Sequence, residues 1–415
     1  MRQALAAGDD TPRTPQIPQA PPDPQDAHVL QSPQDPRGRD DRQPELVVRA
    51  GSPAALLTLV PHLLGFVPEA SLVVIGVAPP RDRIRVTLRY DLPDPPEPDL
   101  VADIVAHAVG VLRTQRLTAA VAVGYGPETL VTPAADELRD AAWQAEIDLR
   151  EFLRVQGGRY WSYTCGNEAC CPAVGVPFEP DPQAAQAAAL IGAGTPVLAS
   201  RAAVAARVAP LGGIAAESMR QATRRAERHI AQLLAKVRKS ARLGAARHMI
   251  AAEGLAAVGA MIARYRDGGR FTSDDEIARI SVALRDLRVR DDAWARMDPA
   301  HAEAHQRLLI DVTRRAQPGY VAAPAALLAF VAWQSGDGAL ANVALDRALA
   351  DDPRYSMATL LRQVITAGAP PSLARLPMTP EEVAASYHDA EDDDAEGADD
   401  DLDMDDQDPD IDDED

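Results

Sequence analysis

Between residues 45 and 163 the chain alternates short apolar runs with longer amphipathic segments. The short runs have the length of β-strands, and the continuously apolar ones have the composition of buried strands. The longer segments have the period of helices. We predict strands at 45–49, 71–78, 83–90, 118–125, 149–155 and 160–163, and helices at 53–64, 99–116 and 133–148. Helices between strands indicate parallel crossovers, so this pattern predicts a mixed α/β sheet.

From about Ala184 onward the strand patterns end, and long segments rich in Ala, Leu and Arg follow. Clusters of Gly, Pro and Asp separate these segments, as is typical between helices. We predict helices at 184–210, 215–268, 274–288, 299–315, 323–335, 339–351 and 355–367. The predicted fold is therefore an α/β domain with a mixed sheet followed by an all-α helical domain.

One predicted helical pair, at 334–353 (QSGDGALANVALDRALADDP), resembles a tetratricopeptide repeat. Gly336 and Asp337 stand where that repeat turns between its helices, and Ala341 and Leu345 stand where its second helix packs. The first helix departs from the pattern, and no second copy follows at the spacing of about 34 residues that arrays require. We therefore favour a single tetratricopeptide-like hairpin over a peptide-binding array.

The formal net charge of −20 over 415 residues lies almost entirely at the two ends of the chain. Residues 389–415 hold 18 acidic and no basic residues, and residues 1–44 hold nine prolines. Such segments bury too little apolar surface to offset the entropy of ordering, so we predict a disordered Pro-rich head and a disordered acidic tail. The 46% hydrophobic share supports folded domains at 45–183 (α/β) and 184–388 (helical).

The compartment follows from what the sequence lacks. The amino terminus has no apolar signal-peptide core, and no stretch supplies the roughly 18 consecutive apolar residues of a membrane span. Three cysteines in a chain of this length do not form a secreted disulfide framework. We expect a cytoplasmic protein without a membrane partner, whose thiols are reduced at rest.

All three cysteines of the chain, Cys165, Cys170 and Cys171, fall within 161–172 (WSYTCGNEACCP), on a loop that leaves the last predicted strand. Neighbouring thiolates bind soft metals, which makes zinc a candidate cofactor, although paired C-x-x-C knuckles and a fourth ligand are missing from the motif. Alternatively, Cys165 and Cys170 bridge across the turn, with Cys171 as a resolving thiol. A third interpretation is that the small cysteines pack a tight loop beneath Trp161.

Other chemical motifs are incomplete. His301 and His305 are four residues apart, but Ala302 stands where a zinc metalloprotease helix carries its glutamate, so we interpret the pair as a polar helix surface. Residues 124–126 (GYG) follow a predicted strand without the remaining glycines of a phosphate loop. No nucleophile elbow or catalytic triad is recognisable in the sequence. No enzyme class follows from these motifs.

Basic side chains concentrate between residues 217 and 248, where nine of them stand against two acidic ones. Helical spacing places several on one stripe, but no aromatic residue interleaves them and residues 45–388 are neutral overall. We therefore predict that an acidic protein, or the tail 389–415 of the same chain, docks here, rather than nucleic acid. The candidate docking residues are Arg220, Arg224, Arg225, Arg228, Lys236, Arg238, Lys239 and Arg242.

Four stretches together resemble a known family: 61–66 (PHLLGF), 161–172, 289–294 (VRDDAW) and the region 323–357. They are similar to an actinobacterial family catalogued only as a domain of unknown function, number 4192, and the likeness covers residues 45–376. The resemblance implies a bacterial cytoplasmic protein, and it brings no activity with it.

Taken together, these features favour a non-enzymatic interaction or regulatory protein that acts through its helical domain on an unknown protein partner. The alternative is an enzyme or metal-binding protein that uses the loop of Cys165, Cys170 and Cys171. Such a site would lie beside the crevice at the carboxyl ends of the strands, where open α/β sheets bind ligands.

Overall fold

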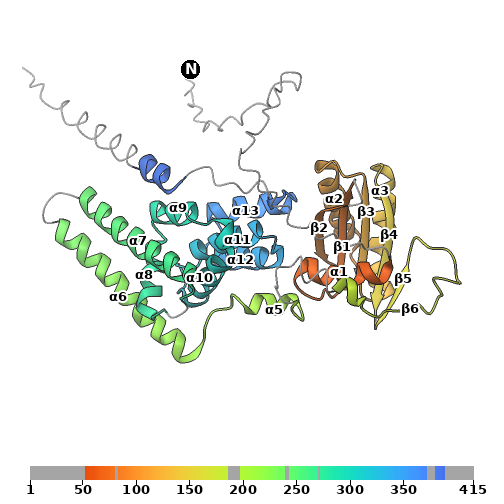
Figure 1. Ribbon diagram of the computed structural model, residues 1–415, viewed down its shortest axis with the longest axis horizontal. Coiled ribbons are helices and arrows are strands. Elements are labelled where there is room, and N and C mark those ends of the chain that lie inside the picture. The colour runs from red at the N-terminus through yellow and green to blue at the C-terminus, as the bar shows by residue number, and fades with distance from the viewer. Residues whose placement is uncertain are drawn as a thin grey trace, which may run out of the picture. The chain divides into compact units, whose positions relative to one another are not determined.

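The computed structural model (Figure 1) describes residues 52–79, 83–185, 197–238, 243–269, 272–371 and 379–387. The predicted head, the predicted strand at 45–49 and the acidic tail lie outside the described residues. Within the described ranges, no helix combines the length and the apolar character that a membrane span needs. The predicted domain boundary at residues 183 and 184 stays a prediction.

A six-stranded sheet forms the first part of the fold, with the strand order β2-β1-β3-β4-β5-β6. Strand β1 is antiparallel to both of its neighbours, whereas β3 and β4 are parallel, so the predicted mixed sheet is confirmed. Both sheet helices that follow β2 connect strands of the same direction. The elements are α1 (Pro53–Leu64), β1 (Ser71–Ala78), β2 (Arg83–Asp91), α2 (Pro98–Thr114), β3 (Ala119–Tyr125), α3 (Glu128–Gln144), β4 (Asp148–Gln156), β5 (Arg159–Ser162) and β6 (Val176–Pro177).

The ends of these elements follow local chemistry, with one prediction that was wrong. Helix α1 begins after Ser52, whose hydroxyl accepts the amide of Ala55, and ends at Gly65 in the left-handed conformation (φ 75°). Helix α3 was predicted at 133–148 but begins at Glu128, so Pro133 lies inside it. The helix tolerates the one amide hydrogen bond that proline lacks because its buried face packs on the sheet.

Two apolar clusters sandwich the sheet. One face packs against α2 and α3 through residues such as Leu72, Phe152 and Val131, and the other face packs against α1 through residues such as Val73 and Leu153. The first glycine of the 124–126 motif serves this packing: a Cβ at that position would lie 2.2 Å from Cγ1 of Val131. Close approach of helix and strand therefore accounts for the glycine without a phosphate.

The rest of the described chain is helical, so the predicted all-α region is confirmed. Residues 380–387 form a further short helix. The named helices are α5 (Arg201–Ala206), α6 (Gly213–Arg238), α7 (Leu243–Arg266), α8 (Asp274–Ala283), α9 (Leu287–Ala295), the 3-10 turn η2 (Pro299–His301), α10 (Ala302–Arg315), α11 (Ala322–Gln334), α12 (Gly338–Asp351) and α13 (Ser356–Thr366).

Three predicted helices are divided differently. The segment predicted as one helix at 215–268 forms α6 and α7, whose junction at 239–242 lies outside the described residues. The helix predicted at 274–288 stops at Ala283, because Asp286 caps the start of α9. The helix predicted at 184–210 is not continuous, since Leu198 forms a parallel β-bridge with Phe66 and Ser200 caps α5.

Helices α11 and α12 pack as a hairpin around a turn in which Gly336 is left-handed (φ 81°) and Asp337 caps α12. Its resemblance to a tetratricopeptide repeat stays a prediction. Helix α11 is buried from Ala322 to Trp333 and has no cap of its own. Instead, the carboxylate of Asp351 in α12 accepts the amides of Gly319 (2.7 Å), Val321 (2.9 Å) and Ala322 (3.0 Å).

Replacement of Asp351 by alanine is expected to destabilise this hairpin by about 1–3 kcal/mol, because three amides at a helix start lose one charged acceptor. Urea unfolding of the full chain measures the loss. The matched control is Asp352→Ala, which removes a side chain that accepts one amide, that of Arg354. Equal losses for the two variants would contradict the capping role of Asp351.

Candidate metal and thiol centre

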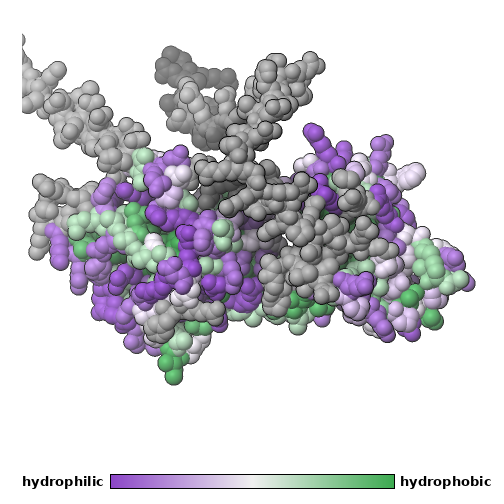
Figure 2. Space-filling model, in the orientation of Figure 1, coloured by the Kyte–Doolittle hydropathy of each residue, from purple (hydrophilic) through white to green (hydrophobic). Residues whose placement is uncertain are grey.

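The cysteine loop, defined as residues 163–175, leaves the end of β5 and returns to β6. Figure 1 shows it projecting from the edge of the sheet beyond β5, and Figure 2 shows hydrophobic surface at this end of the protein. Strand β5 pairs with β4 from Leu153↔Ser162 to Gln156↔Arg159, so the loop begins beside the middle of β4.

The first limb of the loop is held by a glutamate of β4. Oε1 of Glu151 accepts the hydroxyl of Ser162 (2.7 Å) and also that of Thr164. The hydroxyl oxygen of Ser162 in turn accepts the amides of Thr164 (3.2 Å) and Cys165 (3.0 Å). A register shift between Ala120 and Val121 in the β3–β4 pairing brings Glu151 opposite Val121. This bulge therefore sets the position of Glu151 and, through Ser162, the position of the amide of Cys165.

A turn at Asn167 then folds the loop back. The Oδ1 atom of Asn167 accepts the amide of Ala169 (2.9 Å), and its carbonyl accepts the amides of Cys170 (3.1 Å) and Cys171 (2.8 Å). Asparagine suits this place because its short side chain reproduces a backbone turn. The consequence is that Cys170 and Cys171 return to the side of Cys165.

The return limb packs on Trp161. Its indole Nε1 donates to the carbonyl of Ala173 (3.0 Å), and the guanidinium of Arg154 lies over the ring at 3.8 Å from its centroid. Gly175 has φ 77°, and a Cβ there would lie 2.5 Å from the indole. Arg159 of β5 donates to the carbonyl of Gly175 (2.7 Å). Both limbs of the loop are therefore fixed to the sheet.

The three thiols meet at the closed end of this loop. The Sγ atoms of Cys165 and Cys170 are 3.0 Å apart, those of Cys170 and Cys171 are 3.6 Å apart, and all three lie within 4.8 Å of one another. Cys170 is exposed, and Cys165 and Cys171 are half-buried. None of the three belongs to an apolar core of the described chain, and the interpretation as loop packing beneath Trp161 stays a prediction beside the metal and redox ones.

Because the three thiols lie close together, their pKa values differ. Hydrogen bonds from the thiol of Cys170 and from the backbone of Asn167 lower the pKa of Cys165. The hydrogen bond to the thiol of Cys165 raises the pKa of Cys170. Burial, followed by hydrogen bonds to the other two thiols, raises the pKa of Cys171 to about 12. Cys165 is therefore the first of the three to become a thiolate.

Alkylation of the reduced, metal-free protein should follow this order. We expect iodoacetamide to modify Cys165 first and Cys171 last at neutral pH, because the thiolate is the reacting form. As the pH is raised, the rate at Cys165 should level off before the rate at Cys170, whose pKa is higher. Mass spectrometry of the modified peptides measures each rate. A reaction at Cys171 as fast as that at Cys165 would contradict the assigned order.

The thiol geometry suits a soft metal ion. Three thiolates around zinc, at Zn–S distances of about 2.3 Å, stand about 3.8 Å apart. The observed separations of 3.0 Å, 3.6 Å and at most 4.8 Å bracket that value, so small side-chain rotations would form the site. Among the described residues, no histidine or carboxylate joins the three sulfurs as a fourth ligand. One coordination position would remain open.

The sequence of the chain matches a protein-family model. The model for a domain of unknown function, DUF4192, matches residues 53–372, more than half of the chain. The chain belongs to the DUF4192 family. The match confirms the resemblance carried by the four motifs, and the cysteine loop lies inside the matched region. Searches among curated proteins and among solved structures found no match for this DUF4192 chain.

The predicted docking residues of the DUF4192 chain lie mostly on α6. Arg220, Arg224, Arg225, Arg228 and Lys236 are exposed there. Arg220 pairs with Glu217 and Arg225 with Asp275 at 2.7 Å, whereas the other three form no ion pair within 4 Å among the described residues. The side chain of Arg238, and all of Lys239 and Arg242, lie outside the described part of the chain. Partner binding by this surface is still a prediction.

The histidine pair was interpreted wrongly in part. His305 is buried, with 1% of its side chain exposed, so the two histidines do not share a polar surface. The apolar face of α10 carries His305 inward, and burial lowers its pKa. Asp298 accepts from Nδ1 of His301 at 2.8 Å. The rings stand 6.5 Å apart, and they do not form a metal cluster within the described structure.

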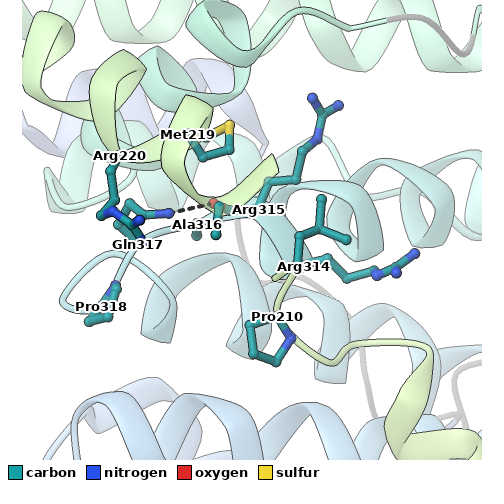
Figure 3. Close-up of a pocket in the computed structure, with 10 residues that line it drawn as sticks. Pro210, Met219, Arg220, Arg314, Arg315, Ala316, Gln317 and Pro318 are labelled. Atoms are coloured by element: carbon teal, nitrogen blue, oxygen red, sulfur yellow. Dashed lines mark hydrogen bonds between the residues drawn. The ribbon is translucent and has the colours of Figure 1, made fainter. Parts of the chain in front are cut away.

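A pocket of about 160 Å³ lies between the start of α6 and the end of α10 (Figure 3). Its guanidinium groups have partners elsewhere: Arg315 binds Asp311 and Asp274, and Arg220 binds Glu217. Figure 3 shows the side chains of Arg314 and Arg315 extending in different directions. The pocket therefore does not gather reactive groups as the cysteine loop does.

The sequence alone did not reveal the residues that position the thiols. Glu151 and Asn167 carry weak signals, since a carboxylate within a strand and an asparagine two residues before an alanine are both common. Gly175 carries none, because its role depends on the indole of Trp161, which lies fourteen residues earlier in β5. Their contribution appears only when β4, β5 and the loop are seen together.

Proposed function

We propose that this DUF4192 protein binds a soft, thiophilic metal ion, with zinc as the first candidate, through Cys165, Cys170 and Cys171. The observation that carries the proposal is the convergence of three Sγ atoms to within 4.8 Å on a loop whose two limbs are hydrogen-bonded to the sheet. Thiolate sulfur prefers soft or borderline ions over magnesium and calcium.

Preorganisation supports this function. Glu151 holds Ser162, whose hydroxyl oxygen accepts the amide of Cys165, and Asn167 accepts the amide of Ala169. These hydrogen bonds order the loop before an ion binds, so binding costs less conformational entropy. The ion must displace the proton of Cys171, whose pKa is raised to about 12. Binding should therefore release protons and strengthen as the pH rises.

A cobalt titration tests the proposal. Reduced, metal-stripped full-length protein is titrated with Co²⁺, and we expect one ion per chain with the intense near-ultraviolet band of thiolate coordination. Zinc should displace cobalt and abolish the band. Replacement of any one of the three cysteines by serine should weaken binding by at least about tenfold, because a ligand is lost.

The matched control for these variants is Ala173→Ser, which changes an exposed residue of the same loop and keeps all three thiols. It should bind cobalt like the wild-type protein. Failure of the reduced wild-type chain to produce the thiolate band with either one or more equivalents of Co²⁺ would overturn the proposal.

A second candidate function, protein binding by the helical region, draws on the surface of α6. Arg224, Arg228 and Lys236 are exposed cations, and the ion pairs of the described residues do not engage them. Several unneutralised charges on one helix attract acidic chains at low ionic strength. Heparin binding by the full-length protein, compared with that of the protein lacking residues 389–415, tests this function.

A further inference from the structure

The three thiols of the loop are not equivalent in geometry. The Sγ atoms of Cys165 and Cys170 are 3.0 Å apart, which is about 1 Å longer than a disulfide bond. Cys170 is exposed, so a small oxidant reaches the pair from solvent. The turn at Asn167 already holds the two residues face to face, because its carbonyl accepts the amide of Cys170 at 3.1 Å.

The backbone geometry disfavours a disulfide between the consecutive residues Cys170 and Cys171. Cys170 and Cys171 are consecutive, so their Cα atoms stand about 3.8 Å apart across a trans peptide. Unstrained disulfides need a Cα separation of about 4.4–6.8 Å. Four residues separate Cys165 from Cys170, and the turn leaves room for the ring that a bond between them closes.

We propose that Cys165 and Cys170 form a reversible disulfide in the presence of a peroxide, and that this bond switches the metal site off. The switch deepens the proposed function, because the released ion is the one that the three thiols hold. The disulfide itself depends only on the geometry of the pair.

The chemistry balances with hydrogen peroxide as the oxidant. The first thiolate of the pair attacks one peroxide oxygen, an S–O bond forms, the O–O bond breaks and water leaves after protonation. The second thiol then attacks that sulfur, the S–S bond forms, the S–O bond breaks and a second water leaves. The pair loses two electrons and two protons, and one peroxide is reduced to two waters.

The disulfide removes two of the three ligands at once. Cys171 is then the remaining thiol of the described cluster, and a single thiolate cannot hold zinc in competition with solvent. Thiol reductants reverse the bond by exchange and restore the site.

The test begins with reduced, metal-stripped full-length protein and a small excess of hydrogen peroxide. We expect the titratable thiols to fall from three to one, and peptide mapping to join Cys165 to Cys170. In Cys171→Ser the same bond should form and leave no thiol. In the double variant Cys170→Ser with Cys171→Ser the oxidation should stop at a sulfenic acid on Cys165, trapped by a cyclic dione. Wild-type mapping alone decides the pairing, so the inference does not depend on variants that fold poorly.

A second arm uses zinc-loaded protein and a chromophoric zinc chelator too weak to strip the reduced site. Peroxide should release the zinc, and dithiothreitol should allow it to bind again. Three surviving thiols, a bond between Cys170 and Cys171, or dimers joined between chains would overturn the switch. Failure of the reduced chain to bind zinc, with the Cys165–Cys170 bond still formed, would overturn the proposed metal function instead.

Discussion

Zinc is expected to raise the melting temperature of the reduced wild-type protein and to leave that of Cys170→Ser nearly unchanged. An ion that binds only the folded loop stabilises it by mass action, and a hundredfold excess over the dissociation constant corresponds to about 2.7 kcal/mol. For a fold of this size that gain amounts to about 4 °C. Differential scanning calorimetry with added zinc, and again with a chelator, measures the shift.

Because Cys170 is exposed, its replacement by serine isolates the effect of losing a metal ligand. Because its side chain is exposed and belongs to no apolar cluster of the described chain, serine should change the metal-free melting temperature by only about a degree. Ala173→Ser again serves as the loop control and should show the full zinc shift. A zinc shift of the same size in Cys170→Ser would mean that the ion binds elsewhere.

Deletion of the acidic tail, residues 389–415, is expected to raise affinity for a polyanion such as heparin by about tenfold at low salt. The tail carries 18 acidic residues, and α6 exposes Arg224, Arg228 and Lys236, which form no ion pair within 4 Å among the described residues. A tethered anionic chain meets this surface at an effective concentration near millimolar and competes with other anions. The difference should shrink at physiological salt, where exposed charges are screened within about 8–10 Å.

The tail follows a helix that contacts α9, and its extended length exceeds that of α6. The helix 380–387, which precedes the tail, contains the buried Val383 and is held to α9 by the hydroxyl of Tyr387, which donates to Asp291 at 2.7 Å. A tail of 27 residues reaches at most about 90 Å when extended, and α6, with 26 residues, is about 39 Å long. Binding to heparin columns or by fluorescence anisotropy at two salt concentrations measures the effect.

Two variants locate the surface in the tail-deleted protein. Arg224→Ser combined with Arg228→Ser should remove most of the gained affinity, whereas Arg279→Ser, an exposed arginine on α8, should remove little. If the full chain and the deletion bind heparin equally at low salt, the tail does not shield α6. Unchanged melting temperatures of the two proteins would show that the deletion leaves the fold intact.

Element types were predictable wherever the pattern was local. The strand at 71–78 and the helix at 53–64 were predicted at the observed residues, because an apolar run and a Ser-Pro start require nothing from distant parts of the chain. The start of α3 was missed because proline is typical of the first position of a helix, whereas here the helix begins one turn earlier and packs its buried face on the sheet. His305 was missed for a related reason, since its burial depends on the neighbours of α10.

The sequence by itself determined the family, the succession of an α/β region and a helical region, and the gathering of all cysteines in one short segment. These properties depend on residue types and short spacings. Only the tertiary structure decided what the cysteines form, because Glu151 reaches the loop from a neighbouring strand through a bulge and Trp161 receives Gly175 against its ring. Distances between sulfur atoms depend on these contacts across strands, and no spacing along the chain encodes them.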